Sequence, residues 1–74
     1  MEENKFIENF ATIFDDTDIS ELKMETEFKN LEEWCSLVAL GLLAVMEEEY
    51  DAELSSKDIE NSTTIRDIYE IVKG

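Results

Sequence analysis

The serine at position 36 stands where a polar, acidic stretch of the chain meets its longest apolar run. If a helix begins here, the hydroxyl can accept a hydrogen bond from a backbone N–H of the first turn, as serines at helix N-termini usually do. A phosphate ester on the same oxygen would instead be stabilised by the unpaired N–H groups and the dipole of that helix. Ser36 is therefore a helix cap or an attachment point for an anion.

Residue types that the chain lacks restrict other chemistry. There is no histidine, which excludes Ser-His and Cys-His nucleophile pairs and histidine-ligated zinc. The single cysteine, Cys35, excludes an internal disulfide and a CxxC motif, which is usual for cytoplasmic proteins. We expect Cys35 to act as a small residue rather than as a reactive thiol.

Four oxygen-bearing side chains have the spacing of positions 1, 3, 5 and 12 of an EF-hand calcium loop, namely Asp16, Asp18, Ser20 and Glu27. However, Glu21 occupies the position that needs glycine for the sharp turn, and Lys23 lies where the loop should collect acids. The match is the coincidence expected in an acid-rich segment, so we predict no metal site.

The elements that must position Ser36 follow from the apolar spacing. Apolar residues between Phe6 and Phe14 recur at intervals of one, three and four, which predicts a helix over about residues 3–14. The next twenty or so residues, up to Cys35, are polar and acidic, a long connection for a small domain. Isolated apolar residues in this connection, namely Ile19, Leu22, Phe28 and Leu31, predict a loop that is pinned onto the core.

Three helices are expected in the second half of the chain. Residues Ser36–Tyr50 are strong helix formers without proline and predict the central helix. Ser55 followed by Asp58 resembles a capping box that opens a short helix around Ile59. Thr64 followed by Asp67 repeats this pattern and opens a last helix.

The composition agrees with one small all-α domain over residues 1–74, a bundle of three main helices and one short helix with a long loop between the first two. The chain has 74 residues, a formal net charge of -14 and 43% hydrophobic residues, too apolar for a disordered acidic tail. This charge argues against nucleic acid and anionic membranes and favours a partner with a basic face. No apolar run is long enough to span a membrane, and the acidic N-terminus does not resemble a signal peptide. We expect a cytoplasmic monomer.

Several short motifs, in register along the whole chain, resemble the acyl carrier protein family. They are Ser36-Leu37, Glu47-Glu48-Glu49-Tyr50-Asp51, Glu53-Leu54, Ser62-Thr63-Thr64-Ile65-Arg66-Asp67-Ile68, Thr26-x-Phe28 and the first helix. The resemblance implies that Ser36 receives 4'-phosphopantetheine from coenzyme A through a phosphopantetheinyl transferase. The protein would then not be an enzyme. It would carry acyl intermediates of fatty acid, specialised lipid or polyketide synthesis as thioesters and deliver them to separate enzymes.

The resemblance also implies a place for the acyl chain between the helices. Six apolar residues are the expected lining of that space, namely Phe28, Leu42, Leu43, Met46, Leu54 and Ile59. Each of them would serve equally well as ordinary core. Ser62 replaces an apolar residue of the family's pattern, which bears on the depth of such a space.

Two departures from the family's pattern surround Ser36. Cys35 stands in place of the acid, and Glu33-Trp34 in place of a glycine and its neighbour, which resembles a Trp-x-Ser-Leu variant of freestanding carriers. The segment after Ser36 is apolar on nearly every side, so part of it must face outward. We expect Leu37, Val38 and Gly41 to contact a partner, with Glu47 and Glu48 as the charged rim of that surface.

A second function uses the same surface without any modification. In this alternative the chain is an acidic, non-enzymatic adaptor that binds a partner through the apolar strip of the central helix. Ser36 would then be no more than a helix cap.

Overall fold

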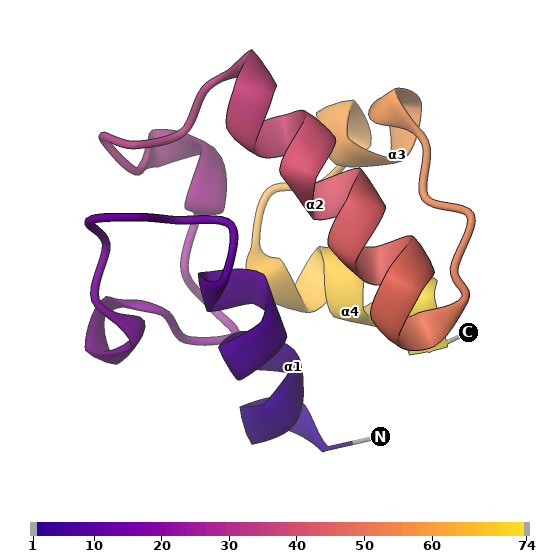
Figure 1. Cartoon of the computed structure of the whole chain (residues 1–74), viewed down its shortest axis with the longest axis horizontal. Coiled ribbons are helices and arrows are strands. Elements are labelled where there is room, and N and C mark those ends of the chain that lie inside the picture. Colours follow the sequence, from indigo (N-terminus) through magenta and orange to yellow (C-terminus); the bar gives the residue numbers. More distant parts are fainter. Residues whose placement is uncertain (1, 74) are drawn as a thin grey trace.

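Between residues 2 and 73 the chain forms four α-helices and two short 3-10 helices. The structure, a computed structural model, describes residues 2–73, and no β-strand occurs among them. The α-helices are α1 (Glu3–Ala11), α2 (Ser36–Tyr50), α3 (Ser56–Asn61) and α4 (Ile65–Lys73), and the 3-10 helices η1 (Ile19–Glu21) and η2 (Phe28–Asn30) lie between α1 and α2 (Figure 1). The predicted small helical bundle is thus confirmed. Within the described residues, no helix combines the length and the apolar character needed to cross a membrane.

The first helix is shorter than its apolar spacing predicts, because α1 ends at Ala11 rather than near residue 14. The N–H groups of Thr12, Ile13 and Phe14 each bond to the carbonyl three residues earlier, so the chain tightens into turns. The Thr12 hydroxyl also donates to the Asn9 carbonyl, at 2.6 Å. Phe14 is nevertheless buried, which is why its spacing resembles a continuing helix.

The long connection between α1 and α2 is fixed to the core, as its apolar residues predict. Leu22 and Phe28 are buried, and so is Met24, whose role the sequence did not reveal. Ile19 is the exception and is 44% exposed. Backbone bonds complete the attachment, because the N–H groups of Ile65 and Arg66 at the start of α4 donate to the carbonyls of Thr26 and Met24, at 3.1 and 2.8 Å.

Both predicted capping patterns in the second half of the chain are present. At α3, Ser55 Oγ accepts from the Asp58 N–H at 3.2 Å, and the Asp58 carboxylate accepts from the Ser55 N–H at 3.0 Å. At α4, the Asp67 carboxylate accepts from the N–H groups of Thr63 and Thr64, and the Thr64 hydroxyl accepts from the Asp67 N–H. These backbone donors lower the pKa of Asp67 below its usual 3.8. Both signals are local, which is why the sequence reveals them.

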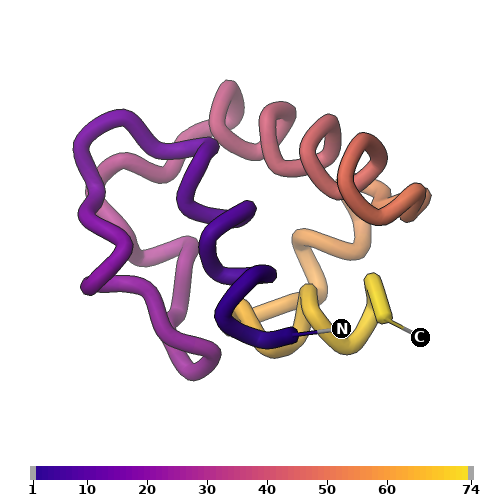
Figure 2. The backbone as a smooth tube through the Cα atoms, turned by 60° about the horizontal axis from the view of Figure 1, so that its bottom comes forward, coloured from indigo at the N-terminus to yellow at the C-terminus, as the bar shows by residue number. Residues whose placement is uncertain are grey.

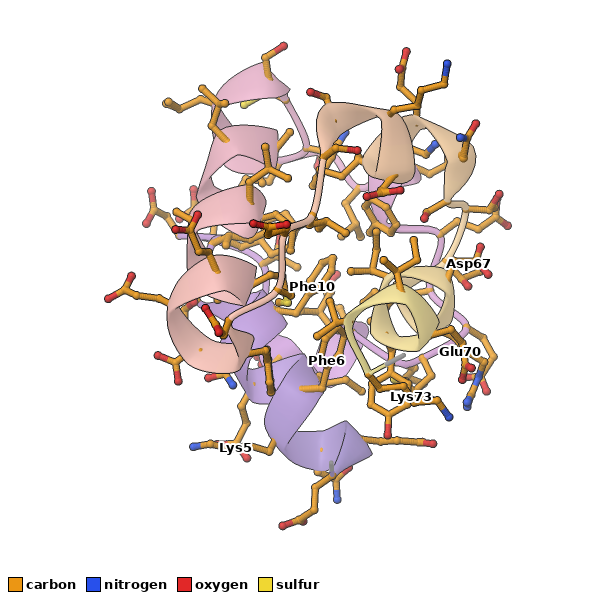
Figure 3. The ribbon with its side chains drawn as sticks, turned by 90° about the vertical axis from the view of Figure 1, so that its right-hand side faces the viewer. Lys5, Phe6, Phe10, Asp67, Glu70 and Lys73 are labelled. Carbon is orange, nitrogen blue, oxygen red and sulfur yellow. The ribbon has the colours of Figure 1, made fainter. Side chains whose placement is uncertain are left out.

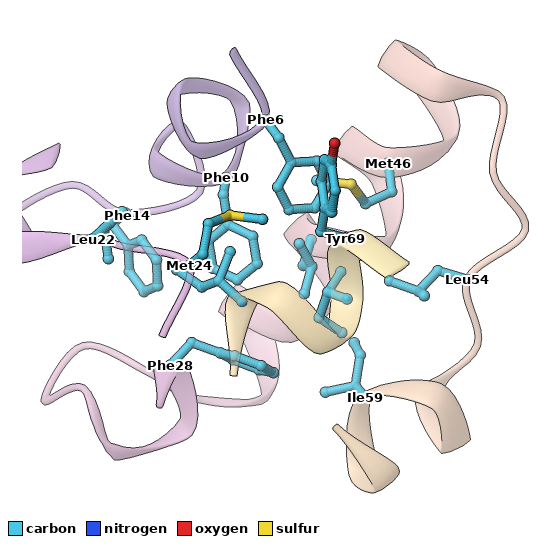
Figure 4. Close-up of a cluster of buried hydrophobic side chains, with 13 residues drawn as sticks. Phe6, Phe10, Phe14, Leu22, Met24, Phe28, Met46, Leu54, Ile59 and Tyr69 are labelled. Atoms are coloured by element: carbon cyan, nitrogen blue, oxygen red, sulfur yellow. The ribbon is translucent and has the colours of Figure 1, made fainter. Parts of the chain in front are cut away.

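Figure 2 shows α2 on one side of the molecule and α1 with α4 on the other, and buried side chains of all three helices form the core. A row of aromatic rings runs through it (Figure 4). Phe6 packs edge-on against Tyr69 of α4 with ring centres 5.1 Å apart, Phe10 packs against Phe28 at 5.5 Å, and Phe28 packs against Trp34 at 4.9 Å. Through this row, the side chain two residues before Ser36 is connected to the centre of the molecule.

The described surface holds few compensating charges. Within residues 2–73, ion pairs join Arg66 to Glu3 and Glu25, and Lys73 to Glu70, and all of these side chains are substantially exposed. Lys73 and Glu70 extend from the same helix end in Figure 3. Such exposed pairs contribute about 0–1 kcal/mol each, so they offset little of the repulsion among the carboxylates.

Candidate functional site

The first helical residue of α2 is Ser36, and this corrects its predicted role as the helix cap. Cys35 occupies the capping position with an extended backbone (φ -158°, ψ 176°), and its side chain makes no capping hydrogen bond. The Ala39 N–H donates to the Cys35 carbonyl at 2.9 Å, which is the first bond of the helix. A capping side chain belongs to the residue before the helix and accepts from an N–H group of the first turn. Ser36 is already helical, and its hydroxyl makes no such bond within residues 2–73.

The hydroxyl of Ser36 is therefore available for other chemistry. Ser36 is exposed, and its side chain makes no hydrogen bond within residues 2–73. The backbone N–H groups of Ser36, Leu37 and Val38 also donate to nothing within this range. The first turn of α2 contains no acid, so the positive end of its dipole is not neutralised there. An anion on the serine oxygen would meet free donors and no carboxylate in that turn.

An open groove of about 860 Å³ begins at Ser36 and runs between α2 and α3. One side comes from α2, with Ala39, Leu40 and Leu43, and the other from α3, with Ser56, Ile59 and Glu60. Trp34, Cys35 and Lys29 complete the lining near Ser36. The Lys29 ammonium donates to the carbonyls of Ile59 and Glu60 at 3.2 and 3.0 Å and so joins η2 to the end of α3.

The six residues predicted to line an acyl space divide into two sets. Leu43 and Ile59 line the groove beside Ser36. The other four are buried members of the core and do not line it, namely Phe28, Leu42, Met46 and Leu54. Ser62, which interrupts the apolar pattern, is buried with its hydroxyl donating to the Asp58 carbonyl at 2.7 Å. The space beside Ser36 is thus a surface groove over a filled core.

The outward face of α2 consists of residues three or four positions apart. Leu37 is 77% and Leu40 is 63% exposed, Ala44 is exposed one turn further on, and Glu47 and Glu48 follow, also exposed. The spacing places all five along one side of the helix. The predicted residues Leu37, Glu47 and Glu48 therefore share a surface, which we call the α2 face, with Leu40 and Ala44.

Val38 and Gly41, which were predicted to belong to this surface, are half-buried at its border with the bundle. Val38 is half-buried and packs against the core. A Cβ atom on Gly41 would lie 3.7 Å from Ile13 Cγ2, so this side of α2 faces the turn that follows α1. The sequence did not distinguish these sides, because an apolar pattern all around a helix gives no direction to its buried face.

Sequence reasoning missed several residues around Ser36. Trp34 and Lys29 line the groove, and Glu33 bonds across to the turn that follows α1. A tryptophan in a polar stretch was a usable signal, whereas nothing in the spacing of Lys29 and Glu33 reveals their partners.

The acidic stretch serves local structure. Asp18 does not complete a calcium loop but caps η1, with its side chain accepting from the Ser20 N–H at 3.1 Å. Among residues 2–73, no group of three or more His, Cys, Asp or Glu side chains could hold a metal ion.

Comparisons with models of protein families, with curated proteins and with solved structures give no match for this chain. Its function must be argued from the site.

Proposed function

We propose that this chain is an acyl carrier protein, with Ser36 as the attachment residue for 4'-phosphopantetheine. The observation that carries the proposal is the exposed, unbonded Ser36 hydroxyl at the uncapped start of α2, at the mouth of a groove. The motif resemblance around Ser36 gives the proposal its chemistry, and the geometry supports it independently.

The residues present fit a phosphodiester. A phosphate on the Ser36 oxygen carries a negative charge, and the free N–H groups of the first turn and the helix dipole stabilise such a charge. The residue directly before the serine is Cys35, so no carboxylate stands next to the attachment oxygen on that side. Attachment would therefore be electrostatically permitted in spite of the net charge of -14.

In the modification step, the Ser36 oxygen attacks a phosphorus of the diphosphate of coenzyme A. The new Ser36 O–P bond replaces the P–O bond to the nucleotide, which leaves as adenosine 3',5'-bisphosphate, and a base on the transferase takes the serine proton. The chain supplies an exposed nucleophile and no general base. When attached, the arm supplies a thiol that carries an acyl group as a thioester.

The groove and the α2 face would have different roles, the groove in holding the arm or its cargo and the α2 face in docking to enzymes. Ala39, Leu43 and Ile59 offer an apolar floor beside Ser36, on which the start of the arm or its cargo can rest. Leu37 and Leu40 offer apolar contact to a docked enzyme, while Glu47 and Glu48 attract a basic rim on it. Tethering beside this docking surface raises the effective concentration of the acyl group at the partner's active site. Such a carrier would work in the cytoplasm with the transferase and separate acyl-loading and acyl-using enzymes.

The proposal is tested by incubating the chain with coenzyme A, Mg²⁺ and a promiscuous phosphopantetheinyl transferase and weighing the intact protein. We expect one phosphopantetheinyl adduct on the wild type and none on Ser36→Ala. Ser56→Ala removes another exposed serine that lines the same groove, and it should retain the adduct. An adduct that persists in Ser36→Ala would contradict the assignment of the attachment residue.

The exposed Leu37 and Leu40 also favour the alternative of an acidic adaptor, which needs the α2 face but no modification. Failure of several transferases to modify the wild type would favour this adaptor over the carrier. Ser36→Ala would then leave partner binding unchanged, whereas Leu40→Asp would weaken it.

A further inference from the structure

The carboxylate of Glu33 binds the turn that follows α1. Its Oε2 accepts from the Asp15 N–H at 2.7 Å, both oxygens accept from the Asp16 N–H at 3.1 Å, and Oε1 accepts from the Thr17 N–H and hydroxyl, both at 2.8 Å. Three successive N–H groups aimed at one anion form a compact backbone anion site. We call this set of contacts, made by Glu33 with Asp15, Asp16 and Thr17, the Glu33 clip.

The Glu33 clip forms in acidic surroundings. Asp16 and Glu21 from the loop and Glu32 from the same segment line the depression beside Glu33, and no lysine or arginine among the described residues pairs with it. Desolvation raises the pKa of Glu33, but the bonds from the Thr17 hydroxyl and from the three N–H groups lower it by more, so it lies below the usual 4.5. Backbone dipoles therefore hold this carboxylate where no cation does.

The position of the Glu33 clip matters because the start of α2 has no local support of its own. Cys35 makes no capping bond, and Ser36 makes no side-chain bond within the described chain. What holds the segment is upstream: the Trp34 ring against Phe28, the bond from the Trp34 N–H to the Leu31 carbonyl at 3.0 Å, and the Glu33 clip. Glu33 is the only one of these anchors that reaches the turn after α1 by a side-chain hydrogen bond within residues 2–73.

We propose that Glu33 is a positioning residue for the modification of Ser36, an inference that rests on the proposed function. The Glu33 clip holds the segment before α2 in one conformation, and this fixes the direction in which the Ser36 oxygen faces a docked transferase. Attack requires the Ser36 oxygen to approach the phosphorus opposite the P–O bond that breaks. A looser segment reaches this orientation less often. The α2 face does not depend on the Glu33 clip, so docking continues without it.

The test compares Glu33→Gln with Glu32→Gln in steady-state transferase assays on the apo chain. Both changes remove one negative charge at adjacent positions, but only Glu33 accepts from the turn. A glutamine presents an amide N–H₂ where one carboxylate oxygen met donors, so the Glu33 clip is broken. We expect Glu33→Gln to lower kcat about tenfold or more with KM for the carrier changed less than about twofold, and Glu32→Gln to match the wild type in both.

A second variant keeps the test usable if Glu33→Gln does not fold. Thr17→Val removes the hydroxyl bond alone and should lower kcat by a smaller factor. The amide NMR shifts of Asp15, Asp16 and Thr17 report the Glu33 clip directly, since they should titrate together below pH 4.5 as Glu33 takes up a proton. Glu33→Gln should abolish that shared step, although the other carboxylates that line the depression, those of Asp16, Glu21 and Glu32, remain in place.

The outcomes are distinct. Unchanged kcat in both Glu33→Gln and Thr17→Val, with altered amide shifts, would overturn the positioning role. An equal loss in Glu32→Gln would assign the effect to charge and overturn it as well. If the wild type itself accepts no phosphopantetheine, the proposed function fails first and this inference falls with it.

Discussion

Cys35 occupies the capping position of α2, where a hydroxyl or carboxylate would stabilise the helix. A serine, threonine, asparagine or aspartate at a helix cap satisfies an N–H group of the first turn, and Cys35 leaves these groups without such a bond. Ser36 makes no side-chain hydrogen bond within residues 2–73 because it is the first helical residue and Cys35 holds the capping position.

Replacing Cys35 with serine should therefore stabilise the fold. We expect Cys35→Ser to raise the free energy of unfolding by about 1 kcal/mol, the usual value of a side-chain cap. Urea denaturation followed by circular dichroism measures this change. Ser36→Ala is the matched control and should stay within about 0.5 kcal/mol of the wild type, because its hydroxyl bonds to nothing in the described chain. A destabilised Cys35→Ser would show that the thiol contributes packing that outweighs a cap.

The pH dependence of stability also belongs to individual carboxylates. Asp67 and Glu33 both have pKa values below their usual ones in the folded chain, through backbone donors in each case. A lowered pKa stabilises the fold above the ordinary value of the group, and this contribution is lost as the pH falls through the lowered value. The loss therefore lies below about pH 4 to 4.5, on the acid side of neutral conditions.

At the scale of elements, the helix starts were predictable and the faces of α2 were not. The capping boxes of α3 and α4 use residues three apart in the chain, so the pattern and the structure contain the same information. Which side of α2 is buried depends on contacts with distant segments, such as Ile13 against Gly41. For this reason Leu37 was expected on the exposed side and lies there, Leu40 was not named, and Val38 and Gly41, expected to be exposed, are half-buried.

The contact of Gly41 with the segment after α1 yields a second stability prediction. A Cβ atom here would lie at 3.7 and 3.8 Å from Ile13, which is ordinary van der Waals contact, and Gly41 has no positive φ. Gly41→Ala should therefore raise the free energy of unfolding by up to about 1 kcal/mol, since glycine is a poor helix former. Thermal unfolding measures it. Gly41→Leu serves as the contrast, because its larger side chain would have to displace Ile13, and an equal gain there would contradict the packing described.

For the molecule as a whole, the net charge of -14 means that negative side chains far outnumber positive ones and repel one another. Arg66 and Lys73 make the ion pairs of the described chain, and both are exposed. We expect the melting temperature to rise with NaCl and more strongly with Mg²⁺, because screening weakens repulsion among carboxylates. Combining Glu48→Gln with Glu49→Gln should raise the melting temperature at low salt. It should also make the melting temperature depend less steeply on salt concentration. A melting temperature that is independent of ionic strength would mean that the charges repel less than their number implies.

The general architecture was accessible from the sequence because apolar spacing, composition and caps agreed with one another. Only part of the lining of the groove beside Ser36 could be predicted from the sequence. Leu43 and Ile59 were expected next to it, but Lys29 and Trp34 reach it through η2 and the aromatic row, whose contacts span distant parts of the chain. Apolar residues of the core and of a groove look alike in a sequence, so Phe28 and Met46 were expected in a space that they do not line.

The backbone bonds from the start of α4 to the long loop set an order on folding. The N–H groups of Ile65 and Arg66 find their acceptors on Thr26 and Met24, so neither segment is complete without the other. During synthesis the loop is made long before α4, and it must wait for that helix to leave the ribosome. The part of the loop that contains Met24 and Thr26 therefore completes its hydrogen bonds only after α4 has been made, and a partner that recognises this part of the loop acts on the finished fold rather than on the nascent chain.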